Sequence, residues 1–118
     1  MRIVVVSPFD AERSALEALL VAEGHAVVSA SRRAEGLALA RTLRPDVVIA
    51  DVQLAQLDGV ALVNELARIA PDARAILLCS RSLQVASPLG ATCLTKPIDL
   101  AQLFALLAPG TPSHVRAG

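Results

Sequence analysis

The chain has 118 residues, of which 54% are hydrophobic, and its 11 basic residues balance 11 acidic ones. This length predicts one compact soluble domain with a sizeable core rather than two domains. A balanced charge provides no net field to attract nucleic acid or an anionic membrane, so neither is expected as a partner. Charged residues interrupt every apolar run before the ~20 residues that a membrane span needs, and no signal-peptide pattern opens the chain. We therefore expect a cytoplasmic protein.

Short apolar runs alternate with helical patterns along the chain. Five runs rich in Val, Ile and Leu are apolar at consecutive positions, as is typical of strands covered on both faces: residues 3–6, 26–30, 47–50, 75–79 and 93–95. Apolar residues recur at helical spacing between and after these runs: Leu16, Leu19 and Leu20; Leu37, Ala40 and Leu43; Leu62, Leu66 and Ile69; Leu100, Leu103 and Leu107. This alternation predicts an α/β, doubly wound fold around a parallel sheet.

Residues typical of helix ends support these boundaries. Asp99 and Gln102 have the spacing of a capping box at the start of the last helix. Gly24 follows the first helix, and Pro45 and Pro71 follow the second and third. Each predicted helix therefore begins or ends at a residue that favours such a boundary.

Two segments do not fit the alternation. The segment 80–92, "SRSLQVASPLGAT", contains Pro88 and Gly90 and is barely long enough for a crossover between parallel strands. We expect a short, partly irregular fourth helix or a loop there. The end of the chain, "PGTPSHVRAG", is typical of a flexible tail or the start of a linker. The predicted organisation is thus one domain over residues 1–108 and a tail over residues 109–118.

Polar residues follow several of the expected strands. In an open parallel sheet, ligands and chemistry gather outside the carboxyl ends of the strands, and Ser7, Asp51, Lys96 and either Cys79 or Ser80 arrive there. Ten of the 11 basic residues are arginine, and Lys96 is the only lysine in the sequence. Lysine supplies a compact point charge that can reach a single oxygen, which the arginine fork does not match. We therefore expect Asp51 and Lys96 to face the same crevice.

At these residues the sequence resembles the receiver domain of bacterial two-component response regulators, over residues 1–108. "RPDVVIADVQLAQLDGVAL" is similar to the family's phosphoacceptor strand and loop, with Asp51 at the phosphoacceptor position. "GATCLTKP" resembles the last strand, with Lys96 in the place of the lysine that contacts the phosphoryl group, and "EGHAVVSA" resembles the second strand. The resemblance implies a flavodoxin-like sheet of order 2-1-3-4-5 with a shortened fourth helix. It also implies a role in a phosphorelay rather than an enzyme, beyond self-phosphorylation and dephosphorylation at Asp51.

The sequence departs from the family pattern around this pair. Ser7 and Pro8 match the positions of the acidic pair that binds Mg²⁺ in the family. Cys79 matches the usual hydroxyl residue, Cys93 the switch aromatic, and Ala55 the proline of the phosphoacceptor loop. The sequence therefore has residues that match the family's phosphoacceptor and lysine, but it lacks the residues that surround these two in the family.

These departures have a physical consequence for phosphoryl transfer. Moving a phosphoryl group onto a carboxylate brings two anions together, and a divalent cation held by carboxylate oxygens normally offsets the repulsion. Ser7 and Pro8 offer only uncharged oxygens, so Asp51 alone is a poor Mg²⁺ site. Asp10 would help only if the turn folded inward, and we expect it as the N-cap of the first helix instead. Without a metal, Asp51 and Lys96 are expected to pair with each other.

Two hypotheses of different classes follow. In the first, the chain is a pseudo-receiver that uses no cofactor and signals through protein-protein contacts, by partner binding or as a homodimer. In the second, it is a working receiver phosphorylated on Asp51 by a histidine kinase or a small phosphodonor, with Mg²⁺ held by an unusual arrangement that includes Asp10. An α/β enzyme of another kind is a third interpretation.

Other residues favour structural interpretations. Cys79 and Cys93 form no CxxC motif and are expected in the core, and we place them near opposite ends of neighbouring strands, where a disulfide is not expected. His25 and His114 have no partner set for catalysis or metal and are expected at the surface. Phe9 lies in the turn after the first strand, where it either contacts a partner or packs on the first helix.

Overall fold

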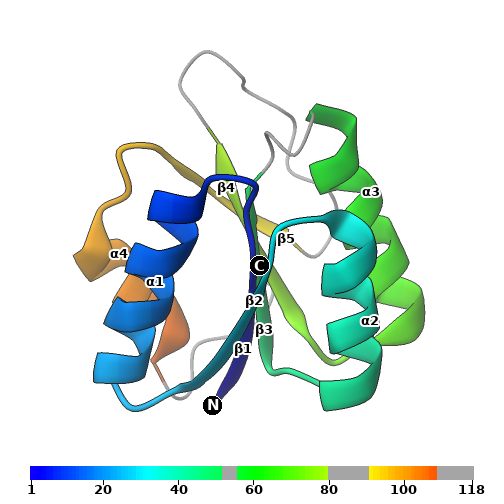
Figure 1. Ribbon diagram of the computed structural model, residues 1–118, viewed down its shortest axis with the longest axis horizontal. Coiled ribbons are helices and arrows are strands. Elements are labelled where there is room, and N and C mark those ends of the chain that lie inside the picture. The colour runs from blue at the N-terminus through cyan, green and yellow to red at the C-terminus, as the bar shows by residue number, and fades with distance from the viewer. Residues whose placement is uncertain (52–55, 80–90, 109–118) are drawn as a thin grey trace, which may run out of the picture.

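The computed structural model describes residues 1–51, 56–79 and 91–108, without the side chains of residues 56–60. The chain forms a five-stranded parallel sheet of order β2-β1-β3-β4-β5, with helices on both faces (Figure 1). The strands are β1 (Arg2–Val6), β2 (Ala26–Ala30), β3 (Val47–Asp51), β4 (Arg74–Cys79) and β5 (Ala91–Thr95). The helices are α1 (Asp10–Ala22), α2 (Arg33–Leu43), α3 (Gln56–Ile69) and α4 (Leu100–Leu107). The predicted doubly wound fold and its strand order are confirmed.

Two predicted segments are not covered by these residues. The short fourth helix or loop was expected over 80–92, of which residues 80–90 lie outside the described residues, while Ala91 and Thr92 belong to β5. The predicted tail, residues 109–118, also lies outside them. Within the described ranges, no helix is long and apolar enough to cross a membrane.

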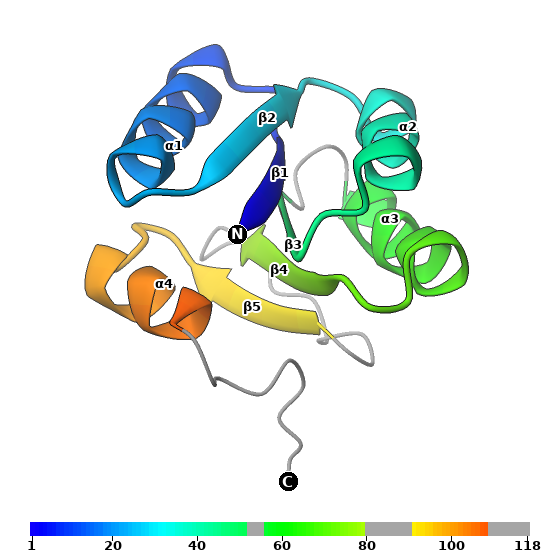
Figure 2. The same cartoon turned by 90° about the horizontal axis from the view of Figure 1, so that it is seen from below.

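The core has two layers because successive strand residues point to opposite faces of the sheet. Val4 and Val6 of β1 pack with residues of α2 and α3, whereas Ile3 and Val5 pack with residues of α1 and α4. Figure 2 shows the corresponding arrangement, with α1 and α4 on one face and α2 and α3 on the other. Residues 3–6 are all buried, so the apolar run is continuous as predicted for a strand covered on both faces.

Helix boundaries follow the predicted signals with one correction. The Asp99 side chain caps α4, since it accepts hydrogen bonds from the backbone N–H of Ala101 at 2.9 Å and of Gln102 at 3.3 Å. Gly24, just after α1, has a φ of +96°, which favours glycine at that position. The prediction that Asp10 is the N-cap of the first helix is wrong, because Phe9 holds that position and Asp10 is the first helical residue.

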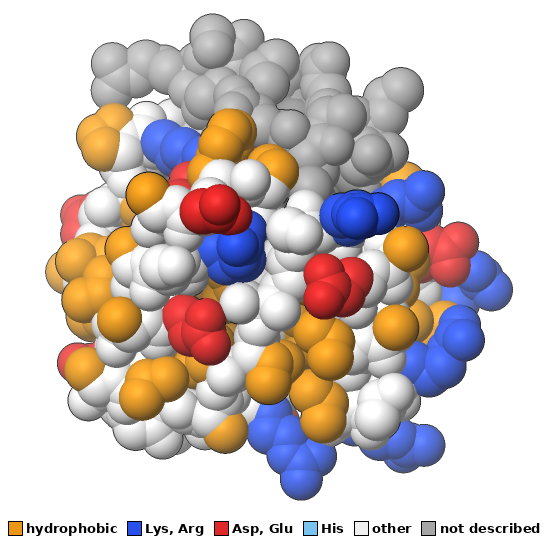
Figure 3. All heavy atoms as spheres, in the orientation of Figure 1, with side chains coloured by type: hydrophobic (Ala, Val, Ile, Leu, Met, Phe, Trp, Pro, Cys, Tyr) orange, Lys and Arg blue, Asp and Glu red, His pale blue; other side chains and the backbone are white. Residues whose placement is uncertain are grey.

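Charge is unevenly distributed over the surface although the net charge is zero. On the face shown in Figure 3, basic side chains gather on the side of α2 and α3. On the other side of the sheet, α1 instead presents two apolar side chains to solvent, because Leu19 and Val21 are 37% and 53% exposed. Helix α2 and its flanking residues carry four arginines that form no ion pair with another described residue: Arg32, Arg33, Arg41 and Arg44. Among the described residues, the α2 and α3 side of the sheet is therefore rich in unpaired basic side chains.

Candidate functional site

A partly buried ion pair lies at the carboxyl ends of the strands. Asp51 ends β3 and is fully buried, and Lys96 follows β5 directly. The Lys96 ammonium group donates to the Asp51 carboxylate, which confirms the predicted pairing. The Lys96 backbone N–H donates to the carbonyl oxygen of Cys79 at 2.7 Å, so the end of β4 holds the lysine backbone in place. The two residues that the sequence singled out therefore contact each other, and the site around them is called the crevice.

A second carboxylate, Glu12, enters the same crevice from the first turn of α1. Its Oε1 lies 2.6 Å from Lys96 Nζ, and its Oε2 accepts a hydrogen bond from Ser7 Oγ at 2.8 Å. The sequence analysis did not identify Glu12. A signal was present, because Glu12 precedes the buried Leu16 and Leu20 at intervals of four residues and so lies on the buried face of α1.

The turn between β1 and α1 is organised by its own side chains. Ser7 is fully buried, and its hydroxyl oxygen accepts from the Phe9 N–H at 3.1 Å while donating to Glu12. Arg13 donates to the Ser7 carbonyl at 2.8 Å and to Asp10 Oδ1 at 2.6 Å. The Asp10 side chain is 89% exposed, so it faces Arg13 and solvent rather than the crevice. The acid that the turn brings inward is Glu12 and not Asp10.

Phe9 covers one side of the crevice. Its ring centroid lies 5.1 Å from Lys96 Nζ, a geometry in which the ring face attracts a cation. The residue is nevertheless 43% exposed. Neither predicted role included this contact, which places the ring over the lysine while leaving part of it available to solvent or a partner.

The electrostatics of the crevice reflect one cation shared by two carboxylates. Burial, followed by the hydrogen bond with Asp51, raises the pKa of Glu12, while Lys96 and Ser7 act in the opposite direction. Burial alone would lower the pKa of Lys96, but its hydrogen bonds to Asp51 and Glu12 outweigh this effect and raise its pKa above 10.5. Lys96 is therefore held in its charged form by the two anions that it binds.

Two thiols lie next to this charged group, and their arrangement corrects the prediction. Cys79 pairs with Thr95, and Cys93 pairs with Leu77, so the cysteines are two positions apart and pack into the same layer of the core. The prediction that they lie near opposite ends of neighbouring strands is therefore wrong. Both thiols are free, with Cys79 buried and Cys93 half-buried. Burial, followed by the neighbouring Cys93, raises the pKa of Cys79 to about 11.

The remaining candidates lie away from the crevice or outside the described residues. His25, just before β2, is half-buried, and its Nδ1 lies 3.3 Å from the N-terminal amine. Ala55, Ser80 and His114 lie outside the described residues.

The donor set of the crevice is a poor match for Mg²⁺, which prefers several oxygen ligands in octahedral geometry. Its two carboxylates, Glu12 and Asp51, already share the Lys96 ammonium group. Ser7 is uncharged, and its hydroxyl donates a hydrogen bond to Glu12. Over the described ranges, no three His, Cys, Asp or Glu side chains group together in a way that could hold a metal ion. We therefore derive no chemical step through a metal.

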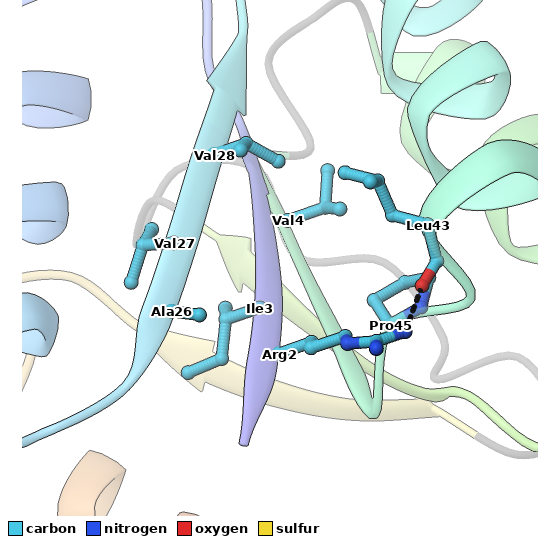
Figure 4. A pocket seen from close by; sticks show the side chains of 8 residues that line it. All are labelled: Arg2, Ile3, Val4, Ala26, Val27, Val28, Leu43 and Pro45. Atoms are coloured by element: carbon cyan, nitrogen blue, oxygen red, sulfur yellow. Dashed lines mark hydrogen bonds between the residues drawn. The ribbon is translucent and has the colours of Figure 1, made fainter.

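An apolar hollow of about 190 Å³ lies at the opposite end of the sheet, between β1, β2 and the end of α2. Figure 4 shows its lining side chains. Arg2 is the one lining residue that carries a charge, and its guanidinium donates to the Leu43 carbonyl at 2.8 Å. The hollow brings together no groups for acid–base or phosphoryl chemistry, so the crevice is the better candidate.

Known proteins resemble this chain in sequence. A family model described as response regulator receiver domain matches residues 3–108. Among curated proteins, the transcriptional regulatory protein AfsQ1 of Streptomyces coelicolor is 36% identical over 66 residues, which cover 56% of this chain and 29% of that protein. The chain therefore spans less than a third of the length of this relative.

Solved structures resemble it in fold. A response regulator receiver domain protein from Clostridium thermocellum aligns with a TM-score of 0.77 at 28% identity, covering 86% of each chain. A response regulator protein from Burkholderia pseudomallei, solved with a phosphorylated aspartic acid, a calcium ion and citrate, aligns with a TM-score of 0.77 at 25% identity. That alignment covers 93% of this chain and 68% of the other.

Proposed function

Because the chain belongs to the response regulator receiver domain family, we propose that it acts in a two-component system as a pseudo-receiver, without metal-dependent phosphorylation. It works through protein-protein contacts. The observation that carries this proposal is the content of the crevice: its carboxylates, Glu12 and Asp51, are bound by Lys96 and by the Ser7 hydroxyl. Because these carboxylate oxygens already have protein partners, a divalent cation would have to displace Lys96 to bind them.

The electrostatic argument supports the proposal further. Phosphoryl transfer to Asp51 adds negative charge beside a second carboxylate, and Lys96 is the one cation that contacts them among the described side chains. Cys79 takes the place of the hydroxyl residue of the family, and a protonated thiol is a weak hydrogen-bond donor. An acyl phosphate in this crevice would therefore be formed slowly and held poorly.

The alternative is a receiver that is phosphorylated on Asp51 through an unusual metal arrangement. Glu12 favours this alternative, because it adds a second carboxylate that the sequence analysis did not count. The Burkholderia relative, with its phosphorylated aspartic acid and calcium ion, illustrates the chemistry that this alternative requires. Asp10 does not contribute, since its side chain pairs with Arg13.

We further propose that residues 1–108 act as one interaction domain, with residues 109–118 as a tail or linker. Its partner is a histidine kinase or another signalling protein, or a second copy of the chain. The proposed contact face consists of β5, α4 and the segment before β5. Ala101 and Gln102 are exposed on this face, and Ala91 and Cys93 are half-buried, whereas Ala86 lies outside the described residues. If charge substitutions at Ala101 and Gln102 leave every partner and self-association constant unchanged, the face is wrongly placed.

A magnesium titration tests the proposed function. The unmodified protein is expected to show no saturable Mg²⁺ binding by calorimetry. Ser7→Asp with Pro8→Asp serves as the positive control, because these changes direct clustered carboxylates toward Asp51 and Glu12. Releasing the fixed backbone angle of Pro8 can reduce the gain, so Ser7→Asp alone is measured as well. Saturable Mg²⁺ binding by the unmodified protein, lost in Asp51→Asn, would contradict the proposal.

A further inference from the structure

The Glu12 carboxylate is bound at both of its oxygens. Lys96 Nζ lies 2.6 Å from Oε1, and Ser7 Oγ donates to Oε2 at 2.8 Å. The Glu12 side chain is 19% exposed, and its carboxylate shares the Lys96 ammonium group with Asp51. These contacts are those of an anionic ligand seated in a binding site, except that the ligand is attached to α1.

The other side of the arrangement is the Lys96 ammonium group, which contacts two carboxylates and an aromatic ring. It binds the carboxylates of Asp51 and Glu12, and the Phe9 ring lies over it at 5.1 Å. A phosphoryl group on Asp51 would extend toward this same ammonium group, because Lys96 contacts the Asp51 carboxylate that would carry it. Carboxylates and phosphates bind ammonium groups through the same kind of charge-assisted hydrogen bond.

We infer that Glu12 is a built-in oxyanion ligand of Lys96, filling the place that an oxyanion attached to Asp51, or bound beside it, would take. This inference rests on the proposed function, because it states how the crevice keeps an anion beside Asp51 without phosphorylation. The class of ligand that competes with Glu12 is a small oxyanion such as formate or inorganic phosphate.

Removing the Glu12 carboxylate therefore exposes a site for an external anion. Glu12→Ala leaves Lys96 with one carboxylate partner and leaves the Ser7 hydroxyl with only a long contact to the Phe9 carbonyl, at 3.5 Å. Formate restores a carboxylate of the right chemistry and is small enough to enter the space that the side chain leaves. Because a ligand that binds only the folded state stabilises it, the melting temperature reports on binding.

The experiment measures melting temperatures of Glu12→Ala in formate and in chloride at equal ionic strength. Saturating formate is expected to raise the melting temperature of Glu12→Ala by about 2–4 °C relative to chloride. The unmodified protein is expected to show no difference. Glu17→Ala is the matched control, since Glu17 is also a half-buried α1 glutamate that accepts a serine hydroxyl, Ser29 Oγ at 3.1 Å, but lies outside the crevice.

Two outcomes overturn the inference. The first is a Glu12→Ala response no larger than that of Glu17→Ala, and the second is a response that survives the addition of Lys96→Met. If Glu12→Ala is too unstable to titrate, Glu12→Gln takes its place, because its uncharged amide binds Lys96 less strongly and formate can displace it. Inorganic phosphate is tested in parallel as the larger oxyanion, and its failure alone would restrict the site to carboxylates and contradict the phosphoryl analogy.

The titration contains neither Mg²⁺ nor a phosphodonor, so it fails or succeeds separately from the proposed function. Phosphorylation of the unmodified protein would end the proposed function even if Glu12→Ala responds to formate. Absence of a formate response would end the inference about Glu12 even if the unmodified protein never accepts a phosphoryl group.

Discussion

The two ends of the sheet hold their charged residues in opposite ways. At the amino end, Arg2 and Asp46 are exposed, and the Arg2 guanidinium donates to the Leu43 carbonyl at the end of α2. At the carboxyl end, Asp51 is fully buried and Lys96 joins it to Glu12. Water screens the carboxyl-end charges less than the amino-end ones, so each amino-end contact is worth little by itself, whereas the carboxyl-end charges depend on one another. Substitutions at Asp51, Lys96 or Glu12 are therefore expected to lower the stability more than substitutions of the amino-end charges.

Removal of Lys96 is expected to have the largest effect on stability. Lys96→Ala leaves the buried Asp51 carboxylate and the partly exposed Glu12 carboxylate without their cation, and stranding a buried charge in this way typically costs about 3–5 kcal/mol of unfolding free energy. Lys96→Met combined with Asp51→Asn removes a charge of each sign and is expected to cost less. Urea unfolding of the two variants measures the difference. Equal losses in the single and double variants would show that the residues do not interact.

The second prediction concerns the alkylation rates of Cys79 and Cys93, which are expected to differ by less, in free-energy terms, than the stability loss of Lys96→Ala. Only the thiolate reacts with iodoacetamide, and a pKa of about 11 in place of 9.0 makes the Cys79 thiolate about 100-fold rarer at pH 8. Its alkylation rate should rise about tenfold per pH unit and level off only near pH 11. Cys93, which is half-buried, serves as the internal reference in peptide mapping. Alkylation of Cys79 at the rate of Cys93 at pH 8 would contradict the described packing.

The smallest effect is expected at the amino end. Arg2→Met removes the guanidinium that binds the Leu43 carbonyl at the end of α2 but keeps an unbranched side chain over the apolar hollow of Figure 4. The loss should be about 0.5–1 kcal/mol, as for other exposed cations at helix ends. Urea unfolding measures it beside Lys96→Ala. If Arg2→Met lost as much unfolding free energy as Lys96→Ala, the charges at the two ends of the sheet would not differ in their effect on stability.

The sequence was sufficient to predict the fold and the Asp51–Lys96 pair. Apolar runs located all five strands, although β2, at the edge of the sheet, is partly exposed rather than covered on both faces as predicted. The placement of Asp51 and Lys96 depends only on where their strands end. Glu12 was missed because its position depends on how α1 is rotated about its axis, although its alignment with Leu16 and Leu20 indicated the buried face. The arrangement of Cys79 and Cys93 was mispredicted because the register of two parallel strands depends on pairing that neither strand reveals alone.

Intact-mass spectrometry after incubation with a small phosphodonor and Mg²⁺ tests the central claim most directly. The account predicts that the unmodified protein gains no phosphoryl group, because Lys96 and Ser7 already bind the carboxylates of its crevice. Ser7→Asp with Pro8→Asp is run beside it to show that the assay detects a metal-dependent adduct. A stoichiometric, Mg²⁺-dependent adduct that maps to Asp51 in the unmodified protein would contradict the account and identify a working receiver.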